Sequence, residues 1–354
     1  MSARRILLRP LSWVFAGGTL VRDWLYERGV YRTTAFDLPT IGVGNLSVGG
    51  TGKTPHVRHL IDQLRDRSSV HMLSRGYGRS THGFRMVRST DTAEEAGDEP
   101  LMIKWLYPDV TVGVSEDRVM GVPELLRDQR PNPVLLLDDV FQHRAIRPGL
   151  NILLTEHDHP YWTDLVLPAG DLREPPQAAR RADVIVVTKC PPDLTAADRD
   201  RLRARIDPQP WQRVFFSTLE HGAPYAVFRT GEPVPAPSTP VLAVTGIARP
   251  EPLLTRLRDH FRTVHHRSFG DHHRFTSTDL ESIDVTLRDL GPDAVIVTTE
   301  KDVARLATHR AWIKRAHWRV FALPVRVRFF AADPSFDQLI DYYVGRTRQE
   351  QRGR

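Results

Sequence analysis

Apolar residues in the first half of the chain gather in short continuous runs that alternate with helix-like stretches. The first run, 38–43, is followed by Val57, Leu60, Ile61 and Leu64, whose spacing is that of one helix face. Fully apolar runs are typical of strands buried on both faces of a parallel sheet. Further strand-like runs lie at 70–73, 110–114, 134–137, 151–154 and 182–189. The pattern predicts an α/β domain built on a parallel sheet.

The pattern changes between residues 217 and 239, where proline and glycine become frequent around one strand-like stretch, 225–228. Such shifts mark domain boundaries. Strand-to-loop-to-helix patterns resume at 241–250 and 295–302. We therefore expect an N-terminal segment at 1–30, a first domain at 31–217, a linker at 218–239, and a smaller α/β domain at 240–354 that faces the first across a cleft.

The stretch between the first strand and its helix has the composition of a phosphate-binding loop. Residues 45–55 read Asn-Leu-Ser-Val-Gly-Gly-Thr-Gly-Lys-Thr-Pro, with Ser47 in place of the first glycine of G-x-x-x-x-G-K-[ST]. Glycines let backbone N–H groups approach phosphate oxygens, and the helix N-terminus adds partial positive charge. A Gly-rich turn with a chance lysine is the alternative. We predict a nucleoside triphosphate site formed by Ser47, Val48, Gly49, Gly50, Thr51, Gly52, Lys53 and Thr54.

Two pairs of adjacent carboxylates add to this signal. Asp138 and Asp139 end a fully apolar run, where a nucleotide site places the carboxylate that holds Mg²⁺ directly or through water. A turn after a strand needs only one aspartate, so the pair favours a metal ligand. Asp98 and Glu99 stand where a helix begins. Helix capping explains them more simply than a general base beside a metal ligand, and both interpretations stay open.

Three further segments carry polar residues whose function cannot be assigned from the sequence pattern alone. The glycines and arginines of 74–79 follow a strand and suit either an anion-binding loop or a solvated turn. Asp271 and His272, followed by a second histidine, suit a metal site or a proton relay. Thr188 and Lys189 lack the aspartate of an Asn-Lys-x-Asp signature, which argues against guanine specificity.

The composition is globular, with 354 residues of which 40% are hydrophobic and 26% charged. A formal net charge of +6 suits an anionic partner without choosing among phosphate, phospholipid headgroup and nucleic acid. The single cysteine, Cys190, excludes an intramolecular disulfide and a cysteine-built zinc site, and fits a reducing cytosol.

Residues 4–30 combine apolar residues at helical spacing with tryptophan and arginine. The longest uncharged run, 10–21, is far shorter than the ~20 residues that span a bilayer. A helix in the membrane interface and a helix packed on the domain core fit this pattern equally well. A secretory or twin-arginine signal ranks below both, because export would separate the nucleotide site from its ligand.

Together, the ordered motifs resemble the tetraacyldisaccharide 4′-kinase family of lipid A biosynthesis over nearly the whole chain. The loop at 44–55 matches a family form that normally lacks the first glycine. Val140 departs from the glycine often found there, which puts the backbone beside the acidic pair in question because β-branched residues disfavour positive φ. The other motifs are Ser-Arg-Gly-Tyr-Gly at 74–78, Gly-Asp-Glu-Pro at 97–100, 137–144, Pro-Ala-Gly-Asp-Leu-Arg-Glu at 168–174, Asp-His-His at 271–273 and Thr-Glu-Lys-Asp at 299–302.

The resemblance implies transfer of the γ-phosphate of ATP, with Mg²⁺, to the 4′-hydroxyl of tetraacyldisaccharide 1-phosphate, which gives lipid IVA. The implied fold is a P-loop NTPase-like parallel sheet domain joined to a smaller α/β domain by a β-ribbon hinge. The implied partners are the lipid A disaccharide precursor and a membrane surface, with no nucleic acid. The N-terminal helix would attach the protein peripherally to the cytoplasmic face of the bacterial inner membrane.

The resemblance also implies roles for individual residues. Asp98 would take the hydroxyl proton, His272 would bond to Asp98 and be held by Asp271, and Lys53 would stabilise phosphate charge. The magnesium ligands would come from Thr54, Asp138, Asp139 and Glu99. The substrate-binding residues would be Asn45, Arg75, Tyr77, Gln142, His143, Arg173 and Glu174.

Two other functions remain open from the residues alone. A P-loop ATPase or GTPase acting as a switch or maturation factor would turn over nucleotide without a lipid acceptor. A non-catalytic membrane-surface protein would bind vesicles without turnover. Neither accounts for the segments at 98, 171–174 and 271–272 together.

Overall fold

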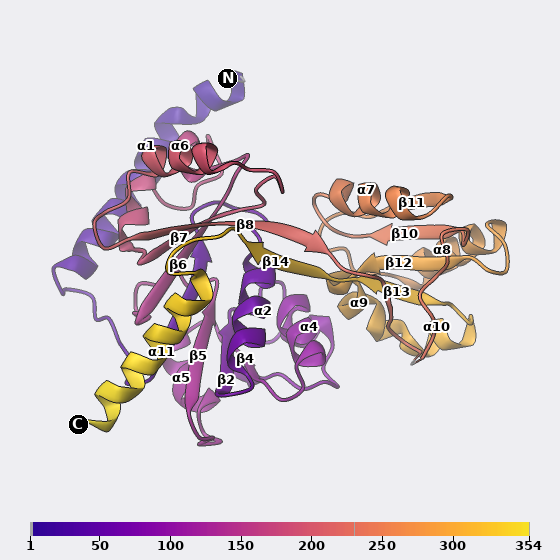
Figure 1. Ribbon diagram of the computed structural model, residues 1–354, viewed down its shortest axis with the longest axis horizontal. Coiled ribbons are helices and arrows are strands. Elements are labelled where there is room, and N and C mark those ends of the chain that lie inside the picture. The colour runs from indigo at the N-terminus through magenta and orange to yellow at the C-terminus, as the bar shows by residue number, and fades with distance from the viewer. Residues whose placement is uncertain (1–2, 230, 354) are drawn as a thin grey trace.

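Two sheets organise the chain in the computed structural model, which describes residues 3–229 and 231–353 (Figure 1). The first has nine strands in the order β14-β8-β7-β6-β1-β5-β2-β4-β3, and the second has five in the order β11-β10-β12-β13-β9. The strands of the first sheet are β1 (Thr40–Asn45), β2 (Ser69–Ser74), β3 (Arg85–Met86), β4 (Thr111–Val114), β5 (Pro133–Asp138), β6 (Leu150–Glu156), β7 (Val184–Thr188), β8 (Arg213–His221) and β14 (Val325–Phe329).

The centre of the first sheet is parallel, as the apolar runs predicted. Strand β1 pairs in parallel with β5 on one side and with β6 on the other. The helices of this first domain are α1 (Ala3–Glu27), α2 (Lys53–Leu64), α3 (Ala93–Ala96), α4 (Asp98–Leu106), α5 (Arg118–Leu125), η1 (Tyr161–Thr163), η2 (Pro176–Arg181), α6 (Ala196–Ile206) and α11 (Phe336–Arg352). The predicted α/β fold with a parallel sheet is confirmed.

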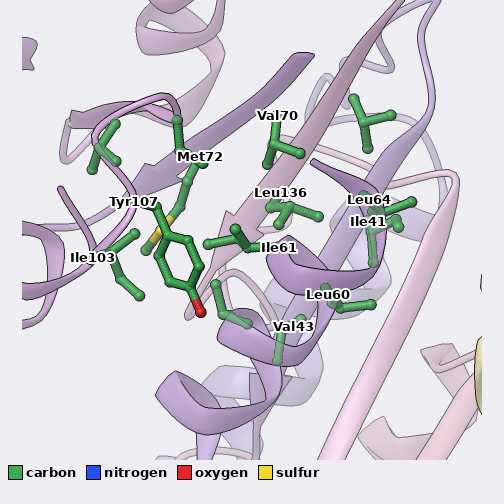
Figure 2. Close-up of a cluster of buried hydrophobic side chains, with 14 of the residues drawn as sticks. Ile41, Val43, Leu60, Ile61, Leu64, Val70, Met72, Ile103, Tyr107 and Leu136 are labelled. Carbon is green, nitrogen blue, oxygen red and sulfur yellow. The ribbon is translucent and has the colours of Figure 1, made fainter. Parts of the chain in front are cut away.

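Helix α2 is fixed to the sheet by its apolar face. Figure 2 shows Leu60, Ile61 and Leu64 beside Ile41 and other apolar side chains of the sheet, and all four named residues are fully buried. Burying a leucine or isoleucine side chain stabilises a fold by roughly 1.5–3 kcal/mol. The start of α2, which directly follows the glycine-rich loop, is therefore held in place by the core.

The second domain is a smaller sheet with helices on it, parallel except for β9, which pairs antiparallel with β13. Its strands are β9 (Tyr225–Ala226), β10 (Val241–Thr245), β11 (Val264–Ser268), β12 (Val295–Thr299) and β13 (Val320–Leu323). Its helices are α7 (Glu251–His260), α8 (Ser277–Asp289), α9 (Glu300–Leu306), η3 (Ala307–His309) and α10 (Arg310–Arg315). Helix α9 lies beside α4 of the first domain (Figure 1).

The C-terminal part of the chain differs from the expected boundary at 240–354. Strand β14 returns to the first sheet and pairs antiparallel with β8, from Val325 opposite His221 to Phe329 opposite Ser217. Helix α11 then packs its apolar residues into the core of the first domain. The β8–β14 pair is the β-ribbon that joins the two domains (Figure 1), so the second domain ends near Leu323.

Helix α1 leaves most of its apolar side chains exposed. Its docking side carries the half-buried Ala16 and the buried Ser12, whose Oγ accepts a hydrogen bond from the N–H of Ala169 at 2.9 Å. Leu7, Trp13 and Val14 are 80%, 72% and 75% exposed. No described helix has both the length and the apolar content needed to cross a bilayer. The first two residues of the expected segment at 1–30 lie outside the described part of the chain.

A buried histidine on α2 makes the stability of the first domain depend on pH. The His56 ring contacts Gly52 O at 2.8 Å and Ser217 Oγ at 2.9 Å, and burial lowers the pKa of His56 to about 4. The unfolded chain, with its ordinary pKa of 6.5, binds more protons at acid pH. The contribution of His56 is complete above pH 6.5 and falls by up to about 3 kcal/mol as the pH approaches 4.

We expect a His56→Gln variant to lose part of this acid sensitivity, because glutamine keeps hydrogen-bonding capacity but takes up no proton. The free energy of unfolding, measured by urea titration between pH 4.5 and 7.5, should have a smaller pH slope in the variant than in the wild type. Identical slopes would contradict the assignment.

Candidate active site

The loop between β1 and α2 forms an open cradle of backbone groups. Gly49 and Gly52 have φ of +114° and +88°, which residues with side chains rarely adopt. No side chain caps the start of α2, so the N–H groups of its first turn are available to an anion. The loop is supported from behind, because Val48 N–H donates to Asp171 O and Arg173 N–H donates to Leu46 O, each at 2.7 Å.

Lys53 lies between two acceptors at the edge of the sheet. Its Nζ is 3.1 Å from Asn45 Oδ1 and 3.5 Å from Asp139 Oδ1. Arg173 binds both oxygens of Asp139, with Nη2 at 2.9 Å and Nη1 at 3.1 Å, and also contacts Asn45. Burial opposes the charge on Asp139, but Lys53 and Arg173 outweigh it and hold the pKa of Asp139 well below its usual range. A phosphate group bound at this position would contact two cations, Lys53 and Arg173, that the structure already holds in place.

Asp138 is the carboxylate of this edge that forms no ion pair with any described residue. It is buried at the end of β5, and Ser74 Oγ donates to its Oδ2 at 3.0 Å. Its Oδ1 is buried and has no hydrogen-bond partner among the described residues. Burial, with the nearby charges of Glu99 and Asp139, raises the pKa of Asp138 to about 7. An orphaned, partly protonated carboxylate beside a phosphate cradle is suited to a divalent cation.

The backbone beside this acidic pair accommodates Val140 without strain. The left-handed conformation falls on Asp139, whose φ is +48°, and Val140 is not among the residues with positive φ. The Val140 side chain is buried in an apolar cluster with Leu137 and Ile146. The departure from glycine therefore leaves the acidic pair in place.

Asp98 stands at the first position of α4 and faces the second domain. Gly97 before it has φ +88° and comes so close to Gly76 that a Cβ would lie 3.3 Å from the Gly76 Cα. This approach brings the loop with Arg75 and Tyr77 beside Asp98; both side chains are exposed, and the Tyr77 ring lies 5.7 Å from the His272 ring.

His272 reaches Asp98 from the other domain. Its Nδ1 is 3.1 Å from Asp98 Oδ2, and its φ of +56° turns the loop toward α4. Asp271 Oδ1 accepts the N–H of His272 at 3.0 Å, and Asp271 Oδ2 is 3.9 Å from His272 Nε2. Hydrogen bonding to Asp98 raises the pKa of His272. The structure thus brings Asp98 together with Asp271 and His272, which lie more than 170 positions later in the sequence.

Two cations of α9 complete this contact. Lys301 pairs with Glu99, and Arg305 pairs with Asp98. Burial opposes charge on both carboxylates, but these partners, with His272 at Asp98, hold the pKa values of Asp98 and Glu99 below their usual ranges. The sequence patterns assigned no role to Lys301 and did not single out Arg305. Their only local signal is the spacing of four residues, which puts both on one face of a helix.

The remaining expected residues divide into two groups. Gln142 lies at the cradle, where its Nε2 donates to Asn45 O at 2.8 Å. His143 follows it in the chain, and burial lowers the pKa of His143. Arg118, which the sequence did not indicate, is buried and donates to the main-chain oxygens of Asp138 and Asp139. Glu174, however, is fully buried and pairs with Arg22 and Arg181, which places it in the docking of α1 and not on a surface that a substrate contacts.

The chain is similar to a defined set of known proteins. The family model described as Tetraacyldisaccharide-1-P 4′-kinase matches residues 4–344. The tetraacyldisaccharide 4′-kinase of Bacteroides thetaiotaomicron is 39% identical over 351 residues, which cover 95% of this chain and 92% of that protein. The protein of the same name from Parabacteroides distasonis is 40% identical over 348 residues, covering 96% of this chain and 94% of its own.

A solved structure agrees with these sequence matches. It is described as an "apo" form of LpxK from Aquifex aeolicus in complex with ATP, and it is 30% identical in sequence. The TM-score is 0.74, and the match covers 97% of this chain and 99% of that chain.

The placement of Glu174 can be tested by stability. Glu174→Gln should lower the free energy of unfolding by about 3–5 kcal/mol, because Arg22 and Arg181 would lose a fully buried partner. The control Glu220→Gln removes an exposed pair with Arg328 and should cost at most about 1 kcal/mol. Equal effects of the two variants in urea unfolding would show that Glu174 does not anchor α1.

Proposed function

The chain belongs to the tetraacyldisaccharide 4′-kinase family and is a phosphotransferase with an alcohol acceptor; we propose how its own residues divide the work. The part of the site that would bind the phosphate donor, called the donor half, is the loop at 47–54, which includes Lys53. Arg173 and the edge of the first sheet complete it. The acceptor half is Asp98 with His272. The observation that carries this division is the contact of His272 Nδ1 with Asp98 Oδ2 at 3.1 Å, which joins the two domains beside the cradle.

At the donor half, ATP is held mainly by backbone. The uncapped start of α2 and the glycine-rich loop would bind its phosphates, and Lys53 would stabilise charge on the β- and γ-phosphates. Arg173 and Lys53 now neutralise Asp139, so they stand where a phosphate would compete for them. Positioning and charge stabilisation supply most of the catalysis in phosphoryl transfer.

The donor set also suits Mg²⁺. Asp138 fits it best, because its buried Oδ1 has no partner in the described chain, and Thr54 follows Lys53 at the usual hydroxyl position. Asp139 and Glu99 are further candidates, although Arg173 and Lys301 hold them in this structure. When bound by these residues, the ion would offset the negative charge that develops on the phosphate oxygens.

At the acceptor half, Asp98 would take the proton of the 4′-hydroxyl of tetraacyldisaccharide 1-phosphate as the oxygen attacks the γ-phosphorus. His272 would hold the carboxylate, and Asp271 would hold His272. Arg75, Tyr77 and His143 would contact the sugar or its 1-phosphate, and the exposed Tyr77 ring lies 5.7 Å from the His272 ring. A base within hydrogen-bond reach of a poor nucleophile contributes about 10²–10⁴-fold to the rate.

This assignment predicts that Asp98→Asn lowers kcat by about 10²–10⁴-fold, because asparagine fills the same space but accepts no proton. Transfer of labelled phosphate from ATP to purified tetraacyldisaccharide 1-phosphate measures the effect, and ATP affinity should stay within about twofold because Asp98 lies outside the loop that binds it. Asp200→Asn on the exposed face of α6 is the matched control. Full activity of folded Asp98→Asn and His272→Ala would overturn the proposed acceptor half.

We further propose that α1 rests in a membrane interface at the cytoplasmic face of the inner membrane, where ATP is present. The support is the exposed set of Leu7, Trp13 and Val14 together with arginines on the same helix. An amphiphilic acceptor would then meet the enzyme with its acyl chains still in the bilayer. The core-helix alternative is disfavoured because these side chains are mostly exposed and do not belong to the core of the domain.

The membrane proposal predicts that the double variant Leu7→Asp and Trp13→Asp binds vesicles of phosphatidylethanolamine and phosphatidylglycerol at least about tenfold more weakly, since each side chain loses roughly 1.5–3 kcal/mol of burial. Val285→Asp, at an exposed apolar position of α8 in the second domain, is the control and should bind as the wild type. Vesicle flotation measures the difference. Unchanged flotation of the double variant would remove α1 from the membrane contact.

A further inference from the structure

The contact between α4 and α9 contains a guanidinium that the proposed reaction does not yet use. The side chain of Arg305 is 5% exposed, although it comes from the second domain and ends at Asp98 of the first. Its Nε donates to Asp98 Oδ2 at 3.0 Å, and its Nη2 donates to the same oxygen. A buried arginine shared by two domains, at the carboxylate that faces the acceptor, is costly unless it is fully paired.

The second domain surrounds this guanidinium with hydrogen-bond acceptors. Gly246, Thr299 and Asp302 form this binding site, which is called the socket below. Nη1 donates to Gly246 O at 2.6 Å and to Asp302 Oδ1 at 2.8 Å. Asp302 is fully buried and is itself held, because its Oδ2 accepts the N–H of Gly246 at 3.1 Å and the Thr299 hydroxyl at 2.8 Å. The socket also explains a glycine: a Cβ at Gly246 would lie 3.0 Å from Asp302 Oδ1 and 3.2 Å from Arg305 Nη1.

The socket fixes which oxygen of Asp98 stays open. Oδ2 receives both Arg305 donors and faces His272 Nδ1 at 3.1 Å, so its acceptor capacity is used. Oδ1 receives the N–H of Glu99 at 2.9 Å, which leaves room for one more donor. Other charges around this carboxylate are Lys301, paired with Glu99 on the same helix face, and Asp271 behind His272.

We propose that Arg305 is a positioning residue, which docks the second domain onto Asp98 and saturates its Oδ2 so that Oδ1 is the oxygen presented to the acceptor hydroxyl. This inference rests on the proposed role of Asp98. Because Arg305 and His272 both come from the second domain, Asp98 acquires this orientation only when the two domains meet. The acceptor half of the site is therefore completed by domain contact, whereas the donor half is complete within the first domain.

A merely structural ion pair would behave differently from a positioning residue. Removing such a pair lowers stability but leaves the turnover of the folded protein unchanged. A displaced carboxylate instead lowers kcat, because errors of about 1 Å in a reacting group cost up to about 10²-fold in rate. ATP affinity should be preserved, since the phosphate cradle lies entirely in the other domain.

The test compares Arg305→Gln, Arg305→Lys and Gly246→Ala with the wild type in the labelled phosphate-transfer assay. We expect kcat to fall about tenfold or more in Arg305→Gln, with less loss in Arg305→Lys, while the KM for ATP stays within about twofold. Gly246→Ala keeps every charge and should lower kcat in the same direction by crowding the socket. Arg274→Met, which removes an exposed interdomain pair with Glu94, should keep kcat within about twofold.

A distance measurement separates docking from loss of fold. Spin labels at Arg127→Cys and Val285→Cys, in a Cys190→Ala background, report the separation of the two domains by pulsed electron resonance. Arg305→Gln should broaden the distribution relative to the wild type, with unchanged far-ultraviolet circular dichroism. Wild-type kcat and distances in Arg305→Gln, with Asp98→Asn inactive, would overturn the inference alone. Wild-type kcat in both variants would overturn the proposed role of Asp98 itself.

Discussion

Four carboxylates crowd the carboxyl edge of the first sheet, and the rest of the site follows from how their charge is balanced. Asp139 is balanced by Lys53 and Arg173, while Glu99 and Asp98 are balanced by Lys301 and Arg305. Asp138 is the one of the four that forms no ion pair in the described part of the chain, and burial with two negative neighbours outweighs Lys53 and raises its pKa to about 7. A buried negative cluster is tolerated only when cations or protons accompany it. The unbalanced member is therefore the position that a metal ion improves most.

The cations that pair with these carboxylates come from different domains. The partners of Asp139 come from the first domain, close to the cradle, and do not require the second domain. The ion pairs of Asp98 and Glu99 are made by Arg305 and Lys301 of α9 and by His272, all from the second domain, so these pairs form only while the domains touch. The β8–β14 ribbon supplies the connection, and it ties both ends of the second domain to one edge of the first sheet. Under the proposed roles of these residues, donor binding would depend on the first domain alone and acceptor activation on the contact between the domains.

The sequence predicted the elements that depend on a few neighbouring residues. It left open the contacts between residues that are far apart in the chain. The strands, α2 and the loop at 47–54 were predictable because apolar periodicity and glycine spacing act over a few residues. The return of β14 and α11 to the first sheet was not, since their periodicity shows a strand and a helix but not the sheet on which they pack. Arg305 was missed for the same reason: it bonds to Asp98 across 207 residues. Glu174 was expected to bind the substrate, because its motif does not indicate whether the side chain is buried or exposed.

The position of Glu174 shows how α1 and the phosphate cradle are connected. Arg173 and Glu174 are neighbours in the chain, but their side chains have different partners. Arg173 points to Asp139 and Asn45, whereas Glu174 points to Arg22 of α1 and to Arg181.

The main chain of the same segment bonds in both directions. Ala169 N–H donates to Ser12 Oγ of α1, while Arg173 N–H donates to Leu46 O, and Val48 N–H donates to Asp171 O. One segment thus fixes the helix with the exposed apolar face and the loop that would hold ATP at a constant separation. If the acceptor stays in the membrane, as proposed, it must be met at a fixed height above it. This segment would then set the height on the donor side, and contact with the second domain would set it at Asp98.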